Sequence, residues 1–369
     1  MRPLMSLLAV IATAFLTAPV ISCAATPGPA HAAVSPDALP LSLPAPKAGR
    51  ARPLVVVLAD NAGSETTDFT IPYGVLKDSG VADVVSVSTR SGVVQLMMAL
   101  KITADQTLTS FDAANPAGAD IVIVPAMMDG KDPAMLAWLR AQYAKGATIV
   151  SICEGARVVA RTGLLDGHAA ASHWSSLKSL AKAYPAVTWV RDRRYVQSGR
   201  LISTTGVTAS IPVSLALVEA IAGRPAAQAE AERLGVADWS PGHRTADFQV
   251  TGGDYATGLG ALAAVWDHQR VEAPLTDGMD EIALALRADA WSRTFHGKVV
   301  STATDGRAIR SRHGLLITPD AAPRHGSIVL TLADAPAGPA LDTALADIGR
   351  RYGPRTRRLA ALGLEYPPR

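Results

Sequence analysis

The chain has little cysteine, little charge and no long apolar run in its body. Only two of its 369 residues are cysteines, and charged residues make up 18%. Hydrophobic residues make up 49%, a composition that favours a well-buried core and excludes a disordered chain. The formal net charge of +3 is too small to indicate nucleic-acid binding by itself. Beyond the N-terminus no uncharged stretch reaches membrane-spanning length, so we expect a soluble body.

Several common functional motifs are also missing. The eight histidines are scattered without the spacing of metal ligands, so no metal site is expected. No glycine-rich phosphate loop follows the first predicted strand, and we expect no cofactor. A basic cluster near the end is interpreted as a solvated helix face rather than a nucleic-acid or lipid contact; it comprises Arg350, Arg351, Arg355, Arg357 and Arg358.

The first 50 residues predict export. Arg2 precedes an apolar run over residues 4–16, as in a signal peptide. An A-x-A pattern would end this signal at residue 32, whereas a lipobox-like pattern would make Cys23 a lipidated first residue and the only link to a membrane. An uncleaved anchor or a buried helix would also fit the run. Residues 33–50 are rich in Pro, Ala and Ser and predict a linker, so the mature protein is expected in the periplasm, outside the cell or on its envelope.

The body alternates apolar strands with helices. Continuous apolar runs are typical of strands covered on both faces, and strand–helix alternation is typical of a parallel sheet. We therefore predict an α/β fold of the flavodoxin-like type, with a doubly wound, mostly parallel sheet. The expected strands are 54–59, 81–87, 121–124 and 147–152, the expected helices 69–76 and 135–145, and the expected hairpin 92–102.

The fourth of these strands leads directly into Cys153, followed by Glu154 and Gly155. Small residues around a reactive side chain at a sharp strand-to-helix turn are typical of a nucleophile elbow, although Ser151 replaces the usual first glycine. A helix predicted from Arg157 would lower the pKa of the thiol, and the Glu154 N–H could stabilise an oxyanion. The alternative is a structural cysteine buried at a strand end.

Two further observations concern this thiol. If Cys23 is removed or lipidated, Cys153 is the only thiol of an exported domain, where an unpaired cysteine is a liability unless it is buried or used. His173 lies downstream, after a short predicted strand, and could accept the thiol proton. An isolated histidine can equally be packed or exposed without such a role.

A larger set of segments resembles the DJ-1/PfpI superfamily, whose fold is shared with class I glutamine amidotransferases. The resemblance covers about half of the chain and defines a predicted domain over residues 51–239. It is most similar to the isocyanide-hydratase and AraC-regulator sensor branch, but the chain has no helix-turn-helix pair. The segments that carry it are 68–76, 152–155, 163–167, 172–174, 199–203 and 205–210.

The resemblance implies a role for three residues. Cys153 matches the elbow cysteine, Asp68 matches the acidic residue that approaches its sulfur, and His173 matches a nearby histidine in several members. A carboxyl beside a thiolate should have a raised pKa. The alternative for Asp68 is to cap a helix that begins at Phe69, and both roles could hold together.

The chain also departs from the family. Members usually have two glycines after the proline that ends the third core strand. The matching stretch here is Pro125, Ala126, Met127 and Met128, so the bulky methionines are expected to narrow the pocket and make it apolar. The Glu154 side chain would oppose thiolate formation if it pointed inward. Both departures put hydrolysis of the familiar kind in doubt, and both suit a site for sensing or small-ligand binding.

Residues 240–369 predict a smaller C-terminal α/β lobe without a motif of its own. Residues 297–320 are similar to residues 83–105, and the segment from Asp280 is similar to the helix after Asp68. We interpret the lobe as a degenerate partial repeat that lacks the elbow strand; the alternative is an unrelated appendage. Because members of the superfamily commonly dimerise, a dimer or an internal pseudo-dimer is expected.

Two classes of function follow for an exported protein with a small-molecule ligand or substrate. One is a cofactor-independent cysteine hydratase or hydrolase, in which Cys153 attacks and Asp68 and His173 move protons. The other is a sensor or binding module in which Cys153 is a redox-responsive thiol or a pocket wall. An inactive relative with a structural cysteine is the remaining alternative.

Overall fold

The structure is a computed structural model that describes residues 40–332 and 335–367. The predicted signal peptide, the lipobox and residues 33–39 of the predicted linker lie outside the described residues. Within the described residues no helix combines the length and the apolar character that crossing a bilayer requires.

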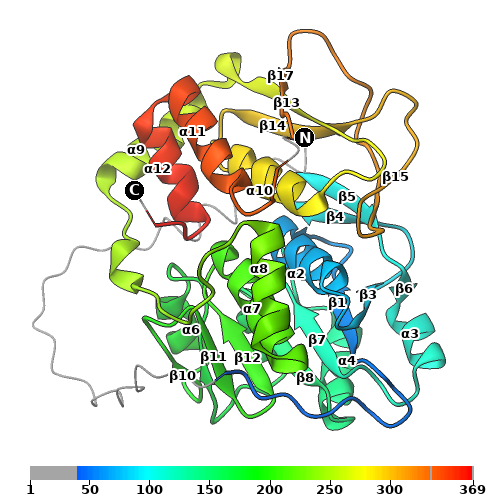
Figure 1. Ribbon diagram of the computed structural model, residues 1–369. Coiled ribbons are helices and arrows are strands. Elements are labelled where there is room, and N and C mark those ends of the chain that lie inside the picture. Colours follow the sequence, from blue (N-terminus) through cyan, green and yellow to red (C-terminus); the bar gives the residue numbers. More distant parts are fainter. Residues whose placement is uncertain (1–39, 333–334, 368–369) are drawn as a thin grey trace, which may run out of the picture. The chain divides into compact units, whose positions relative to one another are not determined.

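The main sheet has seven strands in the order β11-β12-β8-β7-β1-β3-β6 (Figure 1). Every pairing is parallel except that of β11 with β12. This is the predicted doubly wound α/β fold. The strands are β1 (Leu54–Ala59), β3 (Asp83–Ser88), β6 (Gln106–Thr107), β7 (Ile121–Val124), β8 (Thr148–Ser151), β11 (Tyr195–Ser198) and β12 (Leu201–Thr204).

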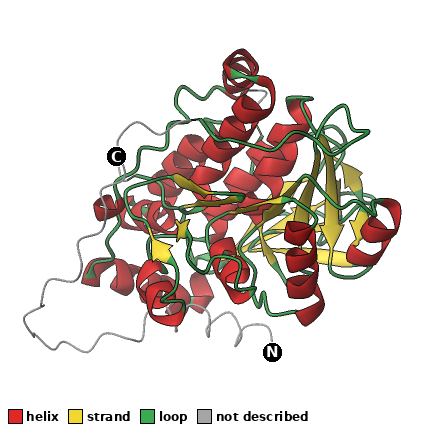
Figure 2. Ribbon diagram, turned by 90° about the horizontal axis from the view of Figure 1, so that it is seen from below, coloured by secondary structure: helices red, strands yellow, loops and turns green. Residues whose placement is uncertain are grey.

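Helices lie on both faces of this sheet (Figure 2). Side chains of β1 alternate between the two faces, as the pleat requires: Val55 and Val57 join one hydrophobic cluster, and Val56 and Leu58 join the other. We call these the α2-side and α4-side clusters. The first includes residues of α2 (Thr66–Asp78), α7 (Ser210–Ala222) and α8 (Arg224–Leu234). The second includes residues of α3 (Leu108–Ala114), α4 (Pro133–Ala144) and α5 (Gly155–Arg161). Helix α6 spans Leu177–Ala183.

A second sheet joins segments that are far apart in the sequence. Its order is β15-β16-β5-β4-β2, and β16 pairs with β5 in antiparallel orientation. The predicted hairpin is present as β4 and β5. The strands are β2 (Ser64–Glu65), β4 (Val93–Met97), β5 (Leu100–Thr103), β15 (Ile309–Arg310) and β16 (Leu316–Ile317).

The C-terminal lobe is an α/β unit, as predicted. Its three-stranded parallel sheet has the order β14-β13-β17, and α10 packs directly against α2 of the main domain (Figure 1). The elements are α9 (Gly252–Ala263), β13 (Gln269–Pro274), α10 (Glu281–Ser292), β14 (Gly297–Thr302), β17 (Ile328–Val329), α11 (Ala340–Tyr352) and α12 (Pro354–Gly363). Short elements elsewhere are β9 (Ala169–Ala170), β10 (Thr188–Trp189), and the 3-10 turns at 207–209, 245–247 and 265–267.

Residues 40–50 are the part of the predicted linker that the structure describes. They form no helix or strand, but they are bound to the domain. Asp120 accepts hydrogen bonds from the Lys47 N–H and from Arg50 Nη1 at 2.9 and 2.7 Å, and the side chain of Gln197 bonds both backbone groups of Ser42. The composition of this segment indicated no fold, because its binding depends on side chains of the body more than 60 positions away.

Candidate active site

Cys153 lies at a strained turn between β8 and α5. Its φ of 56° is in the left-handed region, which costs a non-glycine residue of the order of 1–2 kcal/mol. Hydrogen bonds hold this conformation: the Cys153 N–H donates to Thr205 O at 3.1 Å and to Thr204 Oγ1 at 3.2 Å, and Ser172 Oγ donates to Cys153 O at 3.0 Å. This backbone is that of a nucleophile elbow.

Gly155 is required by the same turn. A Cβ at this position would lie 2.0 Å from Val124 O, so no side chain fits between the start of α5 and the end of β7. Helix α5 begins at Gly155, two residues before the predicted start at Arg157.

The Glu154 side chain does not turn inward. Its Oε1 accepts a bond from Arg157 Nη2 at 3.3 Å, and the side chain is 40% exposed. No hydrogen bond to the Glu154 N–H is found among residues 40–332 and 335–367. This amide is therefore free to stabilise an anion on a ligand, as expected from the sequence.

Asp68 lies in the first turn of α2 and is fully buried. It is not the N-cap, which corrects the capping alternative: the cap is Glu65, whose Oε2 accepts a bond from the Asp68 N–H at 2.6 Å. Asp68 Oδ2 accepts a bond from the Ala126 N–H at 3.1 Å, whereas Oδ1 is buried and has no partner in the described part of the chain. Burial raises the pKa of Asp68 to about 7.

Glu65 extends this acidic cluster. Its Oε2 also accepts a bond from Thr67 Oγ1 at 2.8 Å, and its Oε1 lies 3.1 Å from Nη2 of Arg293, the residue after α10. Arg293 also binds Asp289, which is on α10 and completely buried. Burial, followed by the charge of Asp68, raises the pKa of Glu65 to about 7, and burial raises the pKa of Asp289 well above its ordinary value.

The thiol itself is buried, with 6% of Cys153 exposed. Burial raises its pKa well above the ordinary value, and the charges of Asp68, Glu154, Glu65 and Glu365 act in the same direction, in that order. The expected lowering by a helix N-terminus is therefore wrong for this structure. Helix α5 has only seven residues, and its effect is smaller than that of four carboxyl groups and the loss of solvent.

His173 is linked to a different carboxyl group. Its Nδ1 is 2.7 Å from Ser175 Oγ, and its Nε2 is 3.9 Å from Glu365 Oε2, with no hydrogen bond to Cys153. Glu365 is buried and also accepts bonds from the Gly206 N–H and from His243. Burial lowers the pKa of His173, so this ring is neutral at physiological pH.

A family model described as DJ-1/PfpI family matches residues 53–220. These residues form a DJ-1/PfpI domain. The elbow at Cys153, the acid at Asp68 and His173 all lie within the matched segment, and the lobe from α9 onward lies outside it.

Three relatives illustrate the similarity. The HTH-type transcriptional regulator CdhR of Pseudomonas aeruginosa is 36% identical over 86 residues, which are 23% of this chain and 25% of the regulator. The isonitrile hydratase of Pseudomonas putida is 34% identical over 98 residues, 27% of this chain and 42% of the hydratase. Protein dj-1beta of Drosophila melanogaster is 27% identical over 188 residues, 50% of this chain and 96% of that protein. The crystal structure of the fly protein covers 51% of this chain and 100% of its own, at 24% identity and a TM-score of 0.45.

The two methionines of the DJ-1/PfpI domain differ in their burial. Met128 is 41% exposed, and Met127 packs against the α4-side cluster, whereas Cys153 belongs to the α2-side cluster. Ala126 is the residue of this segment that shares the cluster of Cys153. The narrowing of the pocket by methionine stays a prediction.

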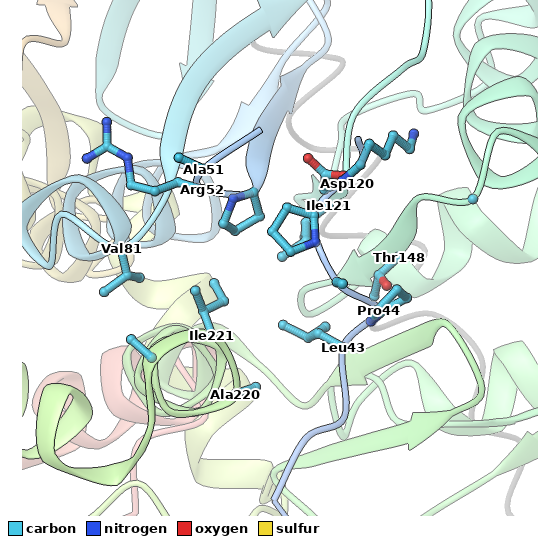
Figure 3. A pocket seen from close by; sticks show the side chains of 16 residues that line it. Leu43, Pro44, Ala51, Arg52, Val81, Asp120, Ile121, Thr148, Ala220 and Ile221 are labelled. Atoms are coloured by element: carbon cyan, nitrogen blue, oxygen red, sulfur yellow. The ribbon is translucent and has the colours of Figure 1, made fainter. Parts of the chain in front are cut away.

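A cleft of about 510 Å³ lies at the other end of the sheet (Figure 3). Leu43 and Pro44 from the N-terminal segment face Ile121, Thr148 and Ile221 across it. Ile121 and Thr148 begin β7 and β8, while Cys153 follows the end of β8, so this cleft is remote from the chemistry.

Sequence reasoning missed Glu65, Asp289, Arg293 and Glu365. Glu65 had a local signal, since an acid three residues before Asp68 resembles a capping pattern. Arg293 had none, because it reaches the DJ-1/PfpI domain from the C-terminal lobe. Among residues 40–332 and 335–367 no cluster of His, Cys, Asp or Glu has the arrangement of a metal site.

Proposed function

We propose that the protein is a cofactor-independent cysteine hydratase or hydrolase that acts on a small electrophilic molecule. One observation carries the proposal: Asp68, whose charge raises the pKa of the strained, buried thiol, has a buried oxygen without a partner in the described residues and a pKa of about 7. A carboxyl group that titrates near neutral pH suits proton transfer in both directions.

The chemistry divides between two side chains. Cys153 Sγ forms a bond to the electrophilic carbon, and ionised Asp68 takes the S–H proton as the bond forms. Asp68 then delivers this proton to the substrate. Water replaces the sulfur in the second half of the reaction, and a proton returns to the thiol, so the net change is the addition of one water molecule. The free N–H of Glu154 stabilises negative charge on the bound substrate.

The raised pKa of the thiol argues against a simple redox sensor. Oxidation-sensitive cysteines are accessible and have a low pKa, whereas Cys153 is 6% exposed and its pKa is raised by burial. A thiol of this kind becomes nucleophilic only when a neighbouring base takes its proton. Asp68 supports that role.

A second candidate is a small-molecule sensor without turnover. The 36% identity to a transcriptional regulator over 86 residues favours it, because that protein carries a similar segment. In this case ligand would bind near Cys153 and no product would form. Detection of product in the experiment below separates the two candidates.

The proposed place of action is outside the cytoplasm. The apolar run at residues 4–16 and the A-x-A pattern before Ala33 support export with cleavage. Mass spectrometry of the mature N-terminus tests this: a chain that begins at Ala33 supports cleavage, a lipidated Cys23 supports an anchored form, and an intact Met1 refutes both.

The test of the mechanism uses the pH dependence of thiol alkylation. With iodoacetamide, wild-type Cys153 should show an inflection near pH 7, where Asp68 ionises and becomes a base, and this inflection should vanish in Asp68→Asn. An aliphatic isonitrile is the first substrate to try, because its hydration gives an N-substituted formamide that is easily detected. Cys153→Ser should form none, and Asp166→Asn, at an exposed site, should behave as wild type. An alkylation profile without an inflection near 7, unchanged by Asp68→Asn, refutes the role of Asp68.

A further inference from the structure

A pattern of hydrogen bonds occurs twice in the chain, 215 positions apart. Asp105 Oδ2 accepts bonds from the N–H and Oγ of Ser86 at 2.9 and 2.8 Å, and Ser86 Oγ accepts one from the Asp105 N–H at 2.8 Å. Asp320 and Ser301 make the same three bonds at 3.0, 2.9 and 3.1 Å. Ser86 is on β3 and Ser301 is on β14, so the two pairs mark equivalent strands.

The elements around these pairs have the same order. Apart from β2, β6 and α3, which have no counterpart in the lobe, the main domain runs β1-α2-β3-β4-β5-β7, and the lobe runs β13-α10-β14-β15-β16-β17. Strand β1 is parallel to both of its neighbours, β3 and β7, and β13 is parallel to both of its neighbours, β14 and β17. Connectivity and pairing therefore agree over six elements.

A helix pair repeats as well. Helix α7 packs on α2 and continues into α8 through Gly223, whose φ and ψ are 85° and 166°. Helix α11 packs on α10 and continues into α12 through Gly353, whose φ and ψ are 86° and 171°. A proline follows both glycines within two residues, at Pro225 and Pro354. The agreement of backbone angles, helix order and proline position indicates that the turn between α7 and α8 is equivalent to the turn between α11 and α12.

The contacts between the two halves are reciprocal. Ile102 on β5 lies opposite Ile317 on β16, its own equivalent 215 positions later, in an antiparallel pair. Thr208 N–H donates to Leu364 O at 3.2 Å, and Gly338 N–H donates to Leu234 O at 2.8 Å. Thr208 and Gly338 precede the two helix pairs, and Leu234 and Leu364 end them, each 130 positions from its equivalent. Such exchange is what a two-fold axis between identical subunits produces.

The second half lacks the parts that make an active site. Residues 330–339 connect β17 to α11, where residues 125–209 connect β7 to α7 and carry the elbow cysteine. The N-caps Glu65 and Asp280 are 215 positions apart, and by this register Ala283 stands where the main domain has Asp68. The second half therefore has neither the thiol nor its acid.

We infer that the C-terminal lobe is a degenerate second copy of the domain that occupies the place of a partner subunit, keeps the chain monomeric and supplies Arg293 and Glu365 to the Cys153 site. Arg293 binds Glu65 at 3.1 Å and Glu365 accepts the Gly206 N–H, so the lobe reaches both sides of the site. These two are positioning residues, because they act through Glu65 and through His173 and its neighbours. This part of the inference rests on the proposed function; the monomeric state does not.

The N-cap of the second half also binds an arginine, but this arginine comes from the same half. The N-cap Asp280 is equivalent to Glu65, and its carboxylate binds Arg312 Nη1 at 2.8 Å. Arg312 is half exposed, whereas Arg293 is largely buried between Glu65 and Asp289. The two arginines make the same kind of bond to equivalent caps, but only Arg293 lies beside a thiol.

The oligomeric state is tested by sedimentation velocity of the purified protein over a hundredfold range of concentration. One species with the mass of a single chain, at most 38.3 kDa, is expected throughout. A stable dimer would overturn the inference, because α10 and β16 of the lobe would then not replace a partner subunit on α2 and β5.

The contribution of Arg293 is tested by the pH profile of Cys153 alkylation. Arg293→Gln removes a positive charge that favours the thiolate, so the alkaline part of the alkylation profile should move to higher pH by about 1 unit or more. Alkylation at a given pH in this range should then be at least about tenfold slower. Arg293→Lys should restore most of the rate, and Arg312→Gln should match wild type. The inference fails if Arg293→Gln leaves the profile unchanged or if Arg312→Gln shifts it equally. Alkylation needs no substrate, so failure of the proposed hydratase activity would leave this result interpretable.

Discussion

Replacement of Asp68 by Asn should stabilise the protein, and the gain should grow with pH. Asp68 is fully buried, and its pKa is raised to about 7 from an ordinary value of 3.8. Between these two values the folded state holds a proton that the unfolded state has released. The folded state therefore loses stability as the pH rises through this window, and the loss is complete above the folded pKa. Asn has nearly the same shape and can still accept the Ala126 N–H bond, but it never ionises.

The magnitude follows from the two pKa values. Burial of this carboxyl group costs about 1.5 kcal/mol of unfolding free energy at pH 5 and about 4 kcal/mol at pH 8. The difference between Asp68→Asn and wild type should therefore grow by about 2–3 kcal/mol from pH 5 to pH 8, as an upper limit. Glu65 adds to the loss of wild-type stability with rising pH, because its pKa is also raised to about 7 by burial and by Asp68.

The assay is equilibrium unfolding in urea at pH 5, 6, 7 and 8, followed by tryptophan fluorescence. Asp166→Asn is the matched control, since Asp166 is exposed and its substitution should change stability by the same small amount at each pH. A stability difference between Asp68→Asn and wild type that stays constant with pH, or that favours wild type at pH 8, would refute the argument that burial raises the pKa of Asp68.

Three other substitutions test separate parts of the structure. Gly155→Ala should prevent the elbow from closing, because a Cβ would lie 2.0 Å from Val124 O; a loss of several kcal/mol in urea unfolding is expected, and a variant as stable as wild type would contradict this packing. Glu365→Gln should lower the pKa of His173 further, because the Glu365 charge opposes the effect of burial; NMR titration of the ring checks this, and an increase would contradict it. Asp120→Ala should cost about 2–3 kcal/mol and open trypsin cleavage at Lys47 and Arg50, since Asp120 accepts two bonds from this segment and a third from the Leu54 N–H at the start of β1; resistance equal to wild type would show that other contacts suffice.

The fold was largely predictable, because its core strands are continuous apolar runs bounded by turns. Residues 54–59 and 121–124 are strands with the predicted bounds. The start of α2 was not predicted, since glutamate is an uncommon cap and the threonines after it indicated a turn. In the site, Cys153 was visible as a local motif and Asp68 through its family resemblance.

The protonation behaviour of the site could not be predicted from the sequence. It depends on how many carboxyl groups gather around one sulfur. Of the four that raise the pKa of Cys153, Glu154 is its neighbour in the sequence and Asp68 was expected from the family resemblance, but Glu65 and Glu365 were not expected. Arg293 lies 228 positions from Glu65, and no local pattern indicates that they meet. The predicted signal peptide and the assignment of the lobe as a repeat stay predictions until the experiments above are done.

The short connection at residues 330–339 has a consequence for ligand binding. In a symmetric pair of subunits two equal pockets can influence one another, and occupancy can depend on concentration in a sigmoidal manner. In the part of the chain that the structure describes, the one thiol, Cys153, lies in the first half and the second half has none. Ligand binding should accordingly follow a hyperbolic saturation curve with one ligand for each chain. A substitution in the interface between the main domain and the lobe also changes only one of the two faces, whereas in a symmetric dimer it would change both.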